Sequence, residues 1–242
     1  MNDIGIILKQ VRQALVNSID AKSSASSSRF YKVGEVAKGY GVKMAEVHKI
    51  AKVTLRQIKG YPKSIIFELC EELWKSGYLE EVAIACKWSE SYFKEFKPAD
   101  FAIFERWLSN YVTSWADCDM LCRQPVVLFV VMYPDYIANL KEWAKSPNRW
   151  MRRGAAVTMT IPAHKGLFLN GVFEIADILL PDKDEMVQKG LGWMLKEASE
   201  ASEIHRKVVF DYVMRNKSAM SHMALRYAID KMPTDMKAEA ME

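Results

Sequence analysis

Hydrophobic and polar positions alternate along most of the chain with the 3.6-residue period of amphipathic helices. Prolines fall mostly between the periodic segments, where a missing N–H is harmless at or before the first turn of a helix. The pattern predicts helices at residues 4–20, 43–57, 62–76, 79–87, 99–112, 115–122, 126–132, 134–145, 149–161, 168–180, 184–199, 203–216 and 219–231.

Two segments need separate interpretation. The run VVLFVVM at residues 126–132 is rich enough in β-branched residues to form a strand, but the sequence offers no partner strand, so a short buried helix is favoured. The serine-rich residues 22–28 offer little to bury, and we interpret them as a flexible linker. We therefore expect an N-terminal helix and linker over residues 1–28, followed by a single helical domain over residues 29–242.

The spacing of the predicted helices indicates the fold class. They form pairs joined by short turns, which recur at intervals of roughly 35 to 45 residues, as in HEAT-like α-solenoids. We predict an all-α solenoid, a right-handed superhelix of antiparallel helix pairs whose concave surface suits a long partner such as duplex DNA. A compact helical bundle is the alternative that periodicity alone leaves open.

Composition agrees with a helical protein and narrows its class. Among 242 residues there are only 11 glycines and 8 prolines, and half of the residues are apolar, so a sizeable core can be buried. A formal net charge of +4 is compatible with an anionic partner without requiring one. Neither a membrane-spanning apolar run nor the features of a signal peptide are evident, so we expect a soluble, cytoplasmic protein that does not bind membranes.

Several kinds of chemistry are disfavoured by what the sequence lacks. Four scattered cysteines do not make a disulfide framework, and Cys118 and Cys122 do not have the spacing of a structural zinc site, so we predict small buried hydrophobic residues. There is no glycine-rich phosphate loop, no HExxH, no GxSxG and no spaced set of His and Cys ligands. We therefore expect neither a metal nor a cofactor.

The first candidate site is the segment SWADCDM at residues 114–120. Ser114 and Asp117 have the spacing of a helix-capping pair, which explains Asp117 structurally. Asp119 follows Trp115 by four residues and so shares its helical face, where the helix dipole favours the anionic carboxylate. The structural alternative is a solvated aspartate beside a core tryptophan.

The second candidate lies in the segment RWMRRGAAV at residues 149–157. Trp150 and Arg153 are three residues apart and share a face, whereas Arg152 points about a quarter turn away. A guanidinium held in this way suits a bidentate contact with a phosphate. The structural alternative is a solvated arginine face.

The third candidate lies within the predicted helix at residues 184–199. Gly190 and Gly192 each cost about 1 kcal/mol relative to alanine in a helix, and such glycines often mark a close approach. Trp193 lies just beyond them, and Lys196 shares its face three residues on. Taken alone, a core tryptophan is the structural alternative.

Together these segments resemble the AlkD-type DNA alkylation repair proteins, which are HEAT-like-repeat DNA glycosylases acting on alkylated purines. The resemblance extends over most of the chain, through SWADCDMLC (114–122), WMRRGAAV (150–157), GWMLKE (192–197) and ALRYAIDKMP (224–233). The functional residues of that family are a tryptophan with an aspartate four residues on, an arginine on a later helix, and a tryptophan in the GWML segment. On matching positions they are Trp115, Asp119, Arg153 and Trp193.

The resemblance implies a monofunctional glycosylase that excises cationic N3- and N7-alkylated purines, such as 3-methyladenine and 7-methylguanine, from duplex DNA. Asp119, with Trp115 and Trp193, would form the catalytic group, and Arg153, with Arg152 and Lys196, would contact DNA. We expect a monomer that associates with the nucleoid when acting on DNA. A non-catalytic HEAT-like protein that binds DNA or serves as a scaffold is the alternative.

Overall fold

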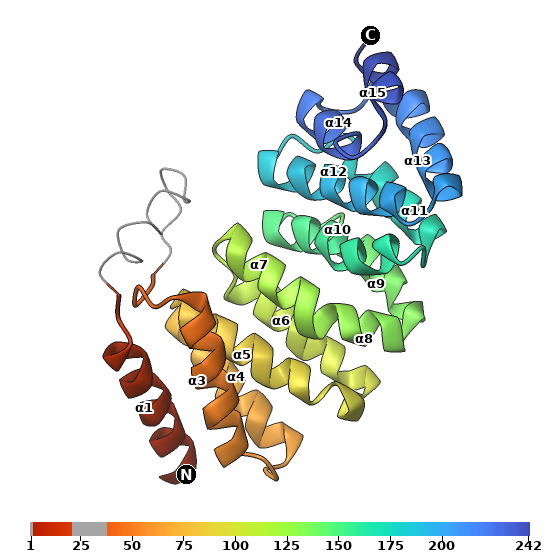
Figure 1. Ribbon diagram of the computed structural model, residues 1–242. Coiled ribbons are helices and arrows are strands. Elements are labelled where there is room, and N and C mark those ends of the chain that lie inside the picture. The colour runs from red at the N-terminus through yellow and green to blue at the C-terminus, as the bar shows by residue number, and fades with distance from the viewer. Residues whose placement is uncertain (1, 21–37) are drawn as a thin grey trace. The chain divides into compact units, whose positions relative to one another are not determined.

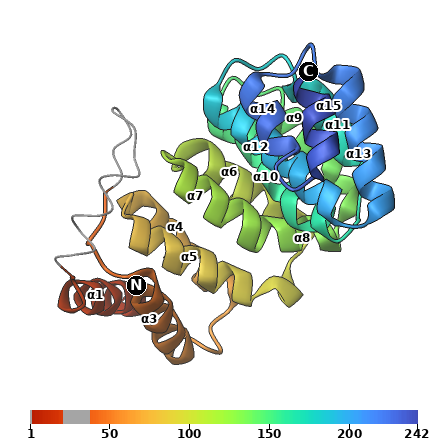
Figure 2. The ribbon, with the colours of Figure 1, turned by 45° about the horizontal axis from the view of Figure 1, so that its top comes forward.

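A computed structural model describes residues 2–20 and 38–242 of the chain (Figure 1, Figure 2). The described part consists of α-helices with short 3₁₀ and π-helical turns, and its only β-type pairing is an isolated bridge between Lys38 and Tyr78. The predicted all-α class is confirmed. The predicted linker at residues 22–28 and the proposed boundary after residue 28 lie outside the described residues.

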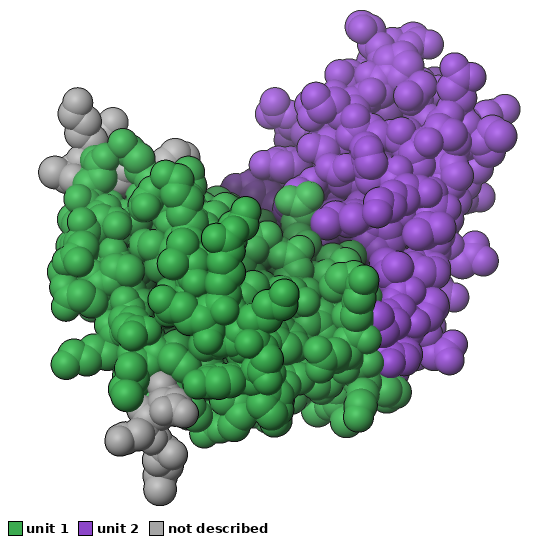
Figure 3. All heavy atoms as spheres, turned by 60° about the horizontal axis from the view of Figure 1, so that its bottom comes forward, with its two compact units in different colours: residues 1–128 green, residues 129–242 purple. Residues whose placement is uncertain are grey.

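The chain divides into two compact units, residues 1–128 and residues 129–242 (Figure 3). The division falls within α8 (Val127–Met132). The strand-like run VVLFVVM forms this helix, apart from its first residue in the preceding π-helical turn, and is helical as predicted. Each unit buries its own set of apolar side chains.

Helix α5 forms the centre of the first unit, where it packs against α3, α4 and α7. Its residues 82–86 are all buried, as expected for a helix covered on every side. The helices described in this unit, besides the part of α8 that it includes, are α1 (Asn2–Asn17), α3 (Met44–Gln57), α4 (Lys63–Ser76), α5 (Leu79–Ser91), α6 (Phe101–Asn110) and α7 (Trp115–Leu121).

Two buried carboxylates in the first turn of α5 hold the N-terminal part of this unit in place. Glu81 accepts hydrogen bonds from Arg12 of α1, at 3.1 Å from both Nε and Nη2, and from the Tyr40 hydroxyl at 2.6 Å. Glu80 accepts the backbone N–H groups of residues 40–42 at 2.9 to 3.1 Å. Because buried carboxylates are costly unless they are hydrogen-bonded, these contacts tie both segments to α5.

Helix α12 has the corresponding position in the second unit, against α10, α11, α13 and α14. Its contact with α10 is close because Gly154, Ala155 and Ala156 of α10 are small and buried. The helices of this unit, besides the end of α8, are α9 (Ile137–Trp143), α10 (Arg149–His164), α11 (Leu169–Leu179), α12 (Glu185–Glu200), α13 (Glu203–Asn216), α14 (His222–Ala228) and α15 (Thr234–Met241). The last of them was not predicted from the sequence.

The sequence also misplaced the end of α10. The predicted helix stops at residue 161, before Pro162, but α10 continues to His164 with Pro162 buried inside it. A proline in the last turn removes only one backbone donor, and the N–H groups of Lys165 and Gly166 close the helix on the carbonyls before them. Gly166, with a φ of 71°, marks the end of the helix.

A second proline is accommodated differently. Pro125 lies in a π-helical turn, Cys122–Val126, in which the N–H of Val127 bonds to the carbonyl of Cys122. This turn joins α7 to α8 without a loop, whereas the sequence pattern predicted two separate helices.

Candidate functional site

The start of α7 confirms the predicted capping pair. The Ser114 hydroxyl accepts the Asp117 N–H at 3.2 Å, and Asp117 Oδ2 accepts the Ser114 N–H at 3.1 Å. Asp117 is buried, and this burial raises its pKa. The carboxylate of Asp117 is therefore used to begin the helix.

Trp115 and Asp119 lie on α7 as the candidate pair requires. They are four residues apart in a regular helix and therefore share a face, and both are partly exposed. The two neighbouring aspartates of α7 thus differ: Asp117 is buried in the cap, whereas Asp119 is partly exposed, as Trp115 is.

Arg152 of α10 is held by three contacts within the second unit. Its Nε lies 2.5 Å from Asp182 Oδ2, and its Nη1 donates to the carbonyls of Ser146 and Pro147, both at 2.9 Å. These bonds join the loop before α10 to the loop before α12. They engage the Arg152 guanidinium within the protein, and the choice between Arg152 and Arg153 as a phosphate contact stays a prediction.

Arg153 points into the contact between α10 and α12. It is 5% exposed, and its Nη1 donates to the carbonyl of Met186 at 2.6 Å. Its Cγ would lie 3.5 Å from a Cβ placed on Gly190. Arg153 is therefore the neighbour of Gly190, but at an ordinary van der Waals distance that does not require a glycine.

Gly192 has a different neighbour. A Cβ at this position would lie 2.5 Å from Tyr227 Cβ and 2.7 Å from the carbonyl oxygen of Ala224. Only a glycine permits α14 to pack so closely against α12. The second predicted approach is thus a helix contact.

Trp193 is partly exposed and is oriented by a carboxylate. Its Nε1–H donates to Glu197 Oε1 at 2.7 Å, and the other oxygen of Glu197 lies 3.0 Å from His164 Nδ1. These three side chains link α12 to the end of α10. An indole fixed in this way is preorganised for a contact at its exposed face.

Lys196 borders a hollow between α12 and α14. It is partly exposed and has no ion-pair partner among the described residues. The hollow, of about 750 Å³, is lined by Lys196, His222, Met223, Arg226, Tyr227 and Asp230. It combines basic side chains with the exposed ring of Tyr227.

The candidate residues are thus distributed over both units. Trp115 and Asp119 lie together on α7 in the first, whereas Arg153 and Trp193 lie on the contacting helices α10 and α12 in the second. The convergence of these two pairs on one site stays a prediction.

Comparison with known proteins shows the family. A family model described as DNA alkylation repair enzyme matches residues 11–232. The chain belongs to this DNA alkylation repair enzyme family. Its fold is shared with a solved structure, that of a predicted DNA alkylation repair enzyme from Enterococcus faecalis, at a TM-score of 0.77 and 16% identity over 90% of this chain and 98% of that one. Among proteins with curated functions, none matches the sequence.

Membership of the DNA alkylation repair family gives the chain a role in repairing alkylation damage, with DNA as its partner. Within the described residues, no helix is both long enough and apolar enough to cross a membrane.

The thiols of this repair protein are inaccessible. All four cysteines are free and buried, as the sequence predicted, and each is 0% exposed. Burial raises the pKa of Cys70 and Cys86. Because the thiolate is the nucleophilic form of cysteine, the two thiols are poor nucleophiles.

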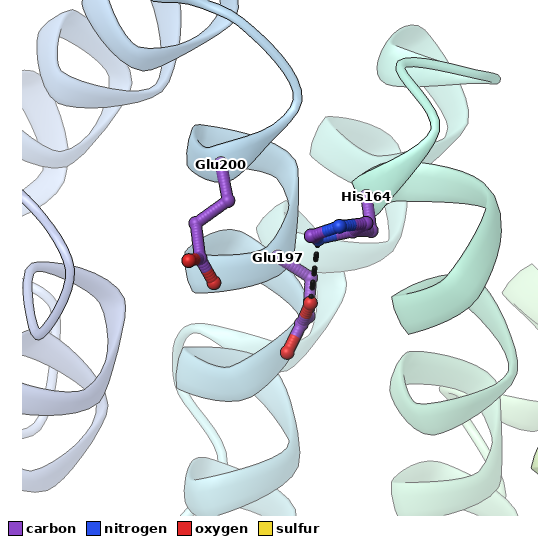
Figure 4. A group of neighbouring side chains, drawn as sticks. All are labelled: His164, Glu197 and Glu200. Carbon is purple, nitrogen blue, oxygen red and sulfur yellow. Dashed lines mark ion pairs between the residues drawn. The ribbon is translucent and has the colours of Figure 1, made fainter.

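Sequence reasoning missed one group of side chains in the repair protein. His164, Glu197 and Glu200 gather where α10 ends beside α12 (Figure 4). The spacing of Glu197 and Glu200 places them on one helical face, which was readable from the sequence. The contribution of His164 was not, because it depends on the packing of two helices.

Proposed function

We propose that this member of the DNA alkylation repair family is a monofunctional DNA glycosylase that excises cationic N3- and N7-alkylated purines from duplex DNA. The observation that carries the proposal is the division of roles on α7. Asp117 is buried in the cap, and Asp119 is partly exposed on the face of the partly exposed Trp115.

The chemistry of the lesion suits a site with a carboxylate. An N3- or N7-alkylated purine carries a positive charge, so its glycosidic bond is weakened and the base leaves as a neutral molecule without protonation by a general acid. The remaining sugar resembles an oxocarbenium ion, which a nearby carboxylate stabilises until water adds to C1′ and gives up a proton. Asp119 supplies that carboxylate in our proposal.

The other candidate residues bind the nucleotide. Trp115 and Trp193 would hold the sugar and backbone, where a cation–π contact adds about 1 to 2 kcal/mol once water is excluded. Lys196, which is partly exposed, would contact a phosphate. Arg153 would have to turn out of the contact between α10 and α12 to reach one, because it is 5% exposed and bonded to the carbonyl of Met186. The hydrogen bond from Trp193 to Glu197 supports this assignment, because it leaves the indole fixed and partly exposed.

The buried cysteines favour hydrolysis over another repair chemistry. Transfer of the alkyl group to a protein thiol requires an accessible thiolate. Cys70, Cys86, Cys118 and Cys122 are all fully buried. Base release needs no such thiol, because water adds to C1′ of the sugar and the alkyl group leaves with the base.

The proposal is tested with Asp119→Asn on methylated duplex DNA. Removing one preorganised electrostatic partner typically costs on the order of 100-fold or more in rate, so release of 7-methylguanine and 3-methyladenine should fall by at least that factor. DNA binding, measured by fluorescence anisotropy, should persist. Asp211→Asn, at an exposed position of α13, is the matched control and should release base at the wild-type rate.

A second variant separates catalysis from folding. Asp117→Asn weakens the cap, so the free energy of unfolding should fall by about 1 kcal/mol while the folded protein still releases base. Wild-type release by Asp119→Asn would sink the proposed role of Asp119. A wild-type protein that binds duplex DNA but releases no cationic base would instead be the non-catalytic DNA-binding alternative.

A further inference from the structure

One group of potential metal ligands lies outside the residues assigned to base release. His164 at the end of α10 offers an imidazole nitrogen, and Glu197 and Glu200 of α12 each offer a carboxylate oxygen. These three atoms all lie within 4.8 Å of one another. Figure 4 shows the imidazole facing the helix that carries both glutamates. We propose that this group binds a divalent transition-metal ion, for which Zn²⁺ is the best match.

The ligand types determine the class of ion. Imidazole suits zinc and its first-row neighbours, whereas Mg²⁺ and Ca²⁺ prefer sites made of oxygen ligands. Two ligands on a tetrahedral Zn²⁺, each at roughly 2.1 Å, lie roughly 3.4 Å apart. His164 Nδ1 and Glu197 Oε2 are 3.0 Å apart, so a small movement admits the ion between them. A water molecule would complete the coordination.

The charges of the cluster also favour a cation. Glu200 is partly exposed and has no hydrogen-bond or ion-pair partner among the described residues. Its ligand oxygen lies within 4.8 Å of that of Glu197, and the imidazole of His164 is paired with Glu197. A divalent ion between the two carboxylates would offset their mutual repulsion.

The site is connected to Trp193 through a shared carboxylate. Glu197 would bind the ion through Oε2 and already accepts the Trp193 Nε1–H through Oε1. When a carboxylate both binds a metal ion and accepts a hydrogen bond, binding of the ion changes the strength and geometry of that hydrogen bond. Occupation of the site should therefore alter Trp193 fluorescence and strengthen the existing link between the end of α10 and α12. This proposal does not depend on base release.

The test uses the untagged full chain after dialysis against a chelator. Isothermal titration calorimetry with Zn²⁺ should show one ion per chain, and Mg²⁺ should not compete. Because the ion binds the folded state, Tm should rise by several degrees at saturating Zn²⁺. Tryptophan fluorescence should change in the same titration, and Trp193→Phe should abolish that change while retaining Zn²⁺ binding.

Variants of the ligands decide the outcome. His164→Gln and Glu200→Gln should each weaken Zn²⁺ binding at least tenfold, with unchanged circular dichroism. His48→Gln and Glu239→Gln, at exposed positions of α3 and α15, are matched controls and should bind Zn²⁺ as the wild type does. The proposal is overturned if the wild type binds no Zn²⁺, or if both ligand variants bind it with unchanged affinity.

Discussion

At the scale of single residues, α12 contains two glycines that look alike in the sequence and meet different surroundings. A Cβ on Gly190 would make an ordinary contact of 3.5 Å with the side chain of Arg153. A Cβ on Gly192 would collide with the backbone of α14 at 2.7 Å. Of these two glycines, Gly192 alone gains a close helix contact that compensates for the cost of a glycine within a helix.

This difference predicts opposite effects of one substitution. Gly190→Ala should raise the free energy of unfolding by up to about 1 kcal/mol, since alanine favours the helix. Gly192→Ala should lower it by about 1 to 3 kcal/mol, because α14 must shift away from the added methyl group. Urea unfolding measures both values. Equal stabilisation by the two alanines would contradict the packing described for Gly192.

How far the site could be predicted depends on where each residue finds its partner. The roles of Ser114 and Asp117 were readable because the capping pair is local. The bond between Arg152 and Asp182 was not, since the two residues lie thirty positions apart along the chain. Long-range partners of this kind leave no periodic signal in the sequence.

At the scale of elements, most helices could be predicted from the sequence because hydrophobic periodicity and proline positions depend on local backbone geometry. The errors arose where tertiary structure overrides a local rule. Pro162 does not end α10, and Pro125 lies within a π-helical turn. In both places buried packing compensates for the lost backbone hydrogen bond.

The first turn of α5 provides a test at this scale. Glu80→Gln replaces a carboxylate that accepts three backbone N–H groups with an amide that has one acceptor oxygen. Leaving buried donors without acceptors should lower the free energy of unfolding by about 2 to 4 kcal/mol. Hydrogen exchange should show the amides of residues 40–42 losing protection before the rest of the first unit.

The matched control for this variant is Glu72→Gln on α4. Glu72 is more exposed and, within the described ranges, pairs only with Lys75 in the next turn, so its loss should cost at most about 0.5 kcal/mol. If the amides of residues 40–42 kept wild-type protection in Glu80→Gln, the anchoring role of Glu80 would be wrong.

At the scale of the whole molecule, the fold class could be predicted from composition and helix spacing, but individual repeats could not be aligned. The solved structure with the same fold is only 16% identical to this chain, so the fold does not require a particular sequence in each repeat. Helix pairs that bury their faces on one another require apolar patterns rather than particular residues.

A net charge of only +4 is compatible with DNA binding without requiring it, so we expect the phosphate contacts to be few and local. Each phosphate contact contributes about 0.9 to the slope of log K against log salt. Lys196→Gln should therefore reduce the magnitude of that slope by about one contact, whereas Arg152→Gln should leave it unchanged and lower stability instead. Fluorescence anisotropy at several salt concentrations measures the slope, and an equal reduction by both variants would contradict the role given to Arg152.

The buried thiols have a further consequence for a protein of this family. Electrophiles that alkylate DNA also attack the soft nucleophiles of proteins, and ionised cysteine is foremost among them. All four cysteines of this chain are enclosed in the interior. The protein therefore exposes no thiol to the agents that alkylate DNA, and its cysteines should stay unmodified under the conditions that cause such damage.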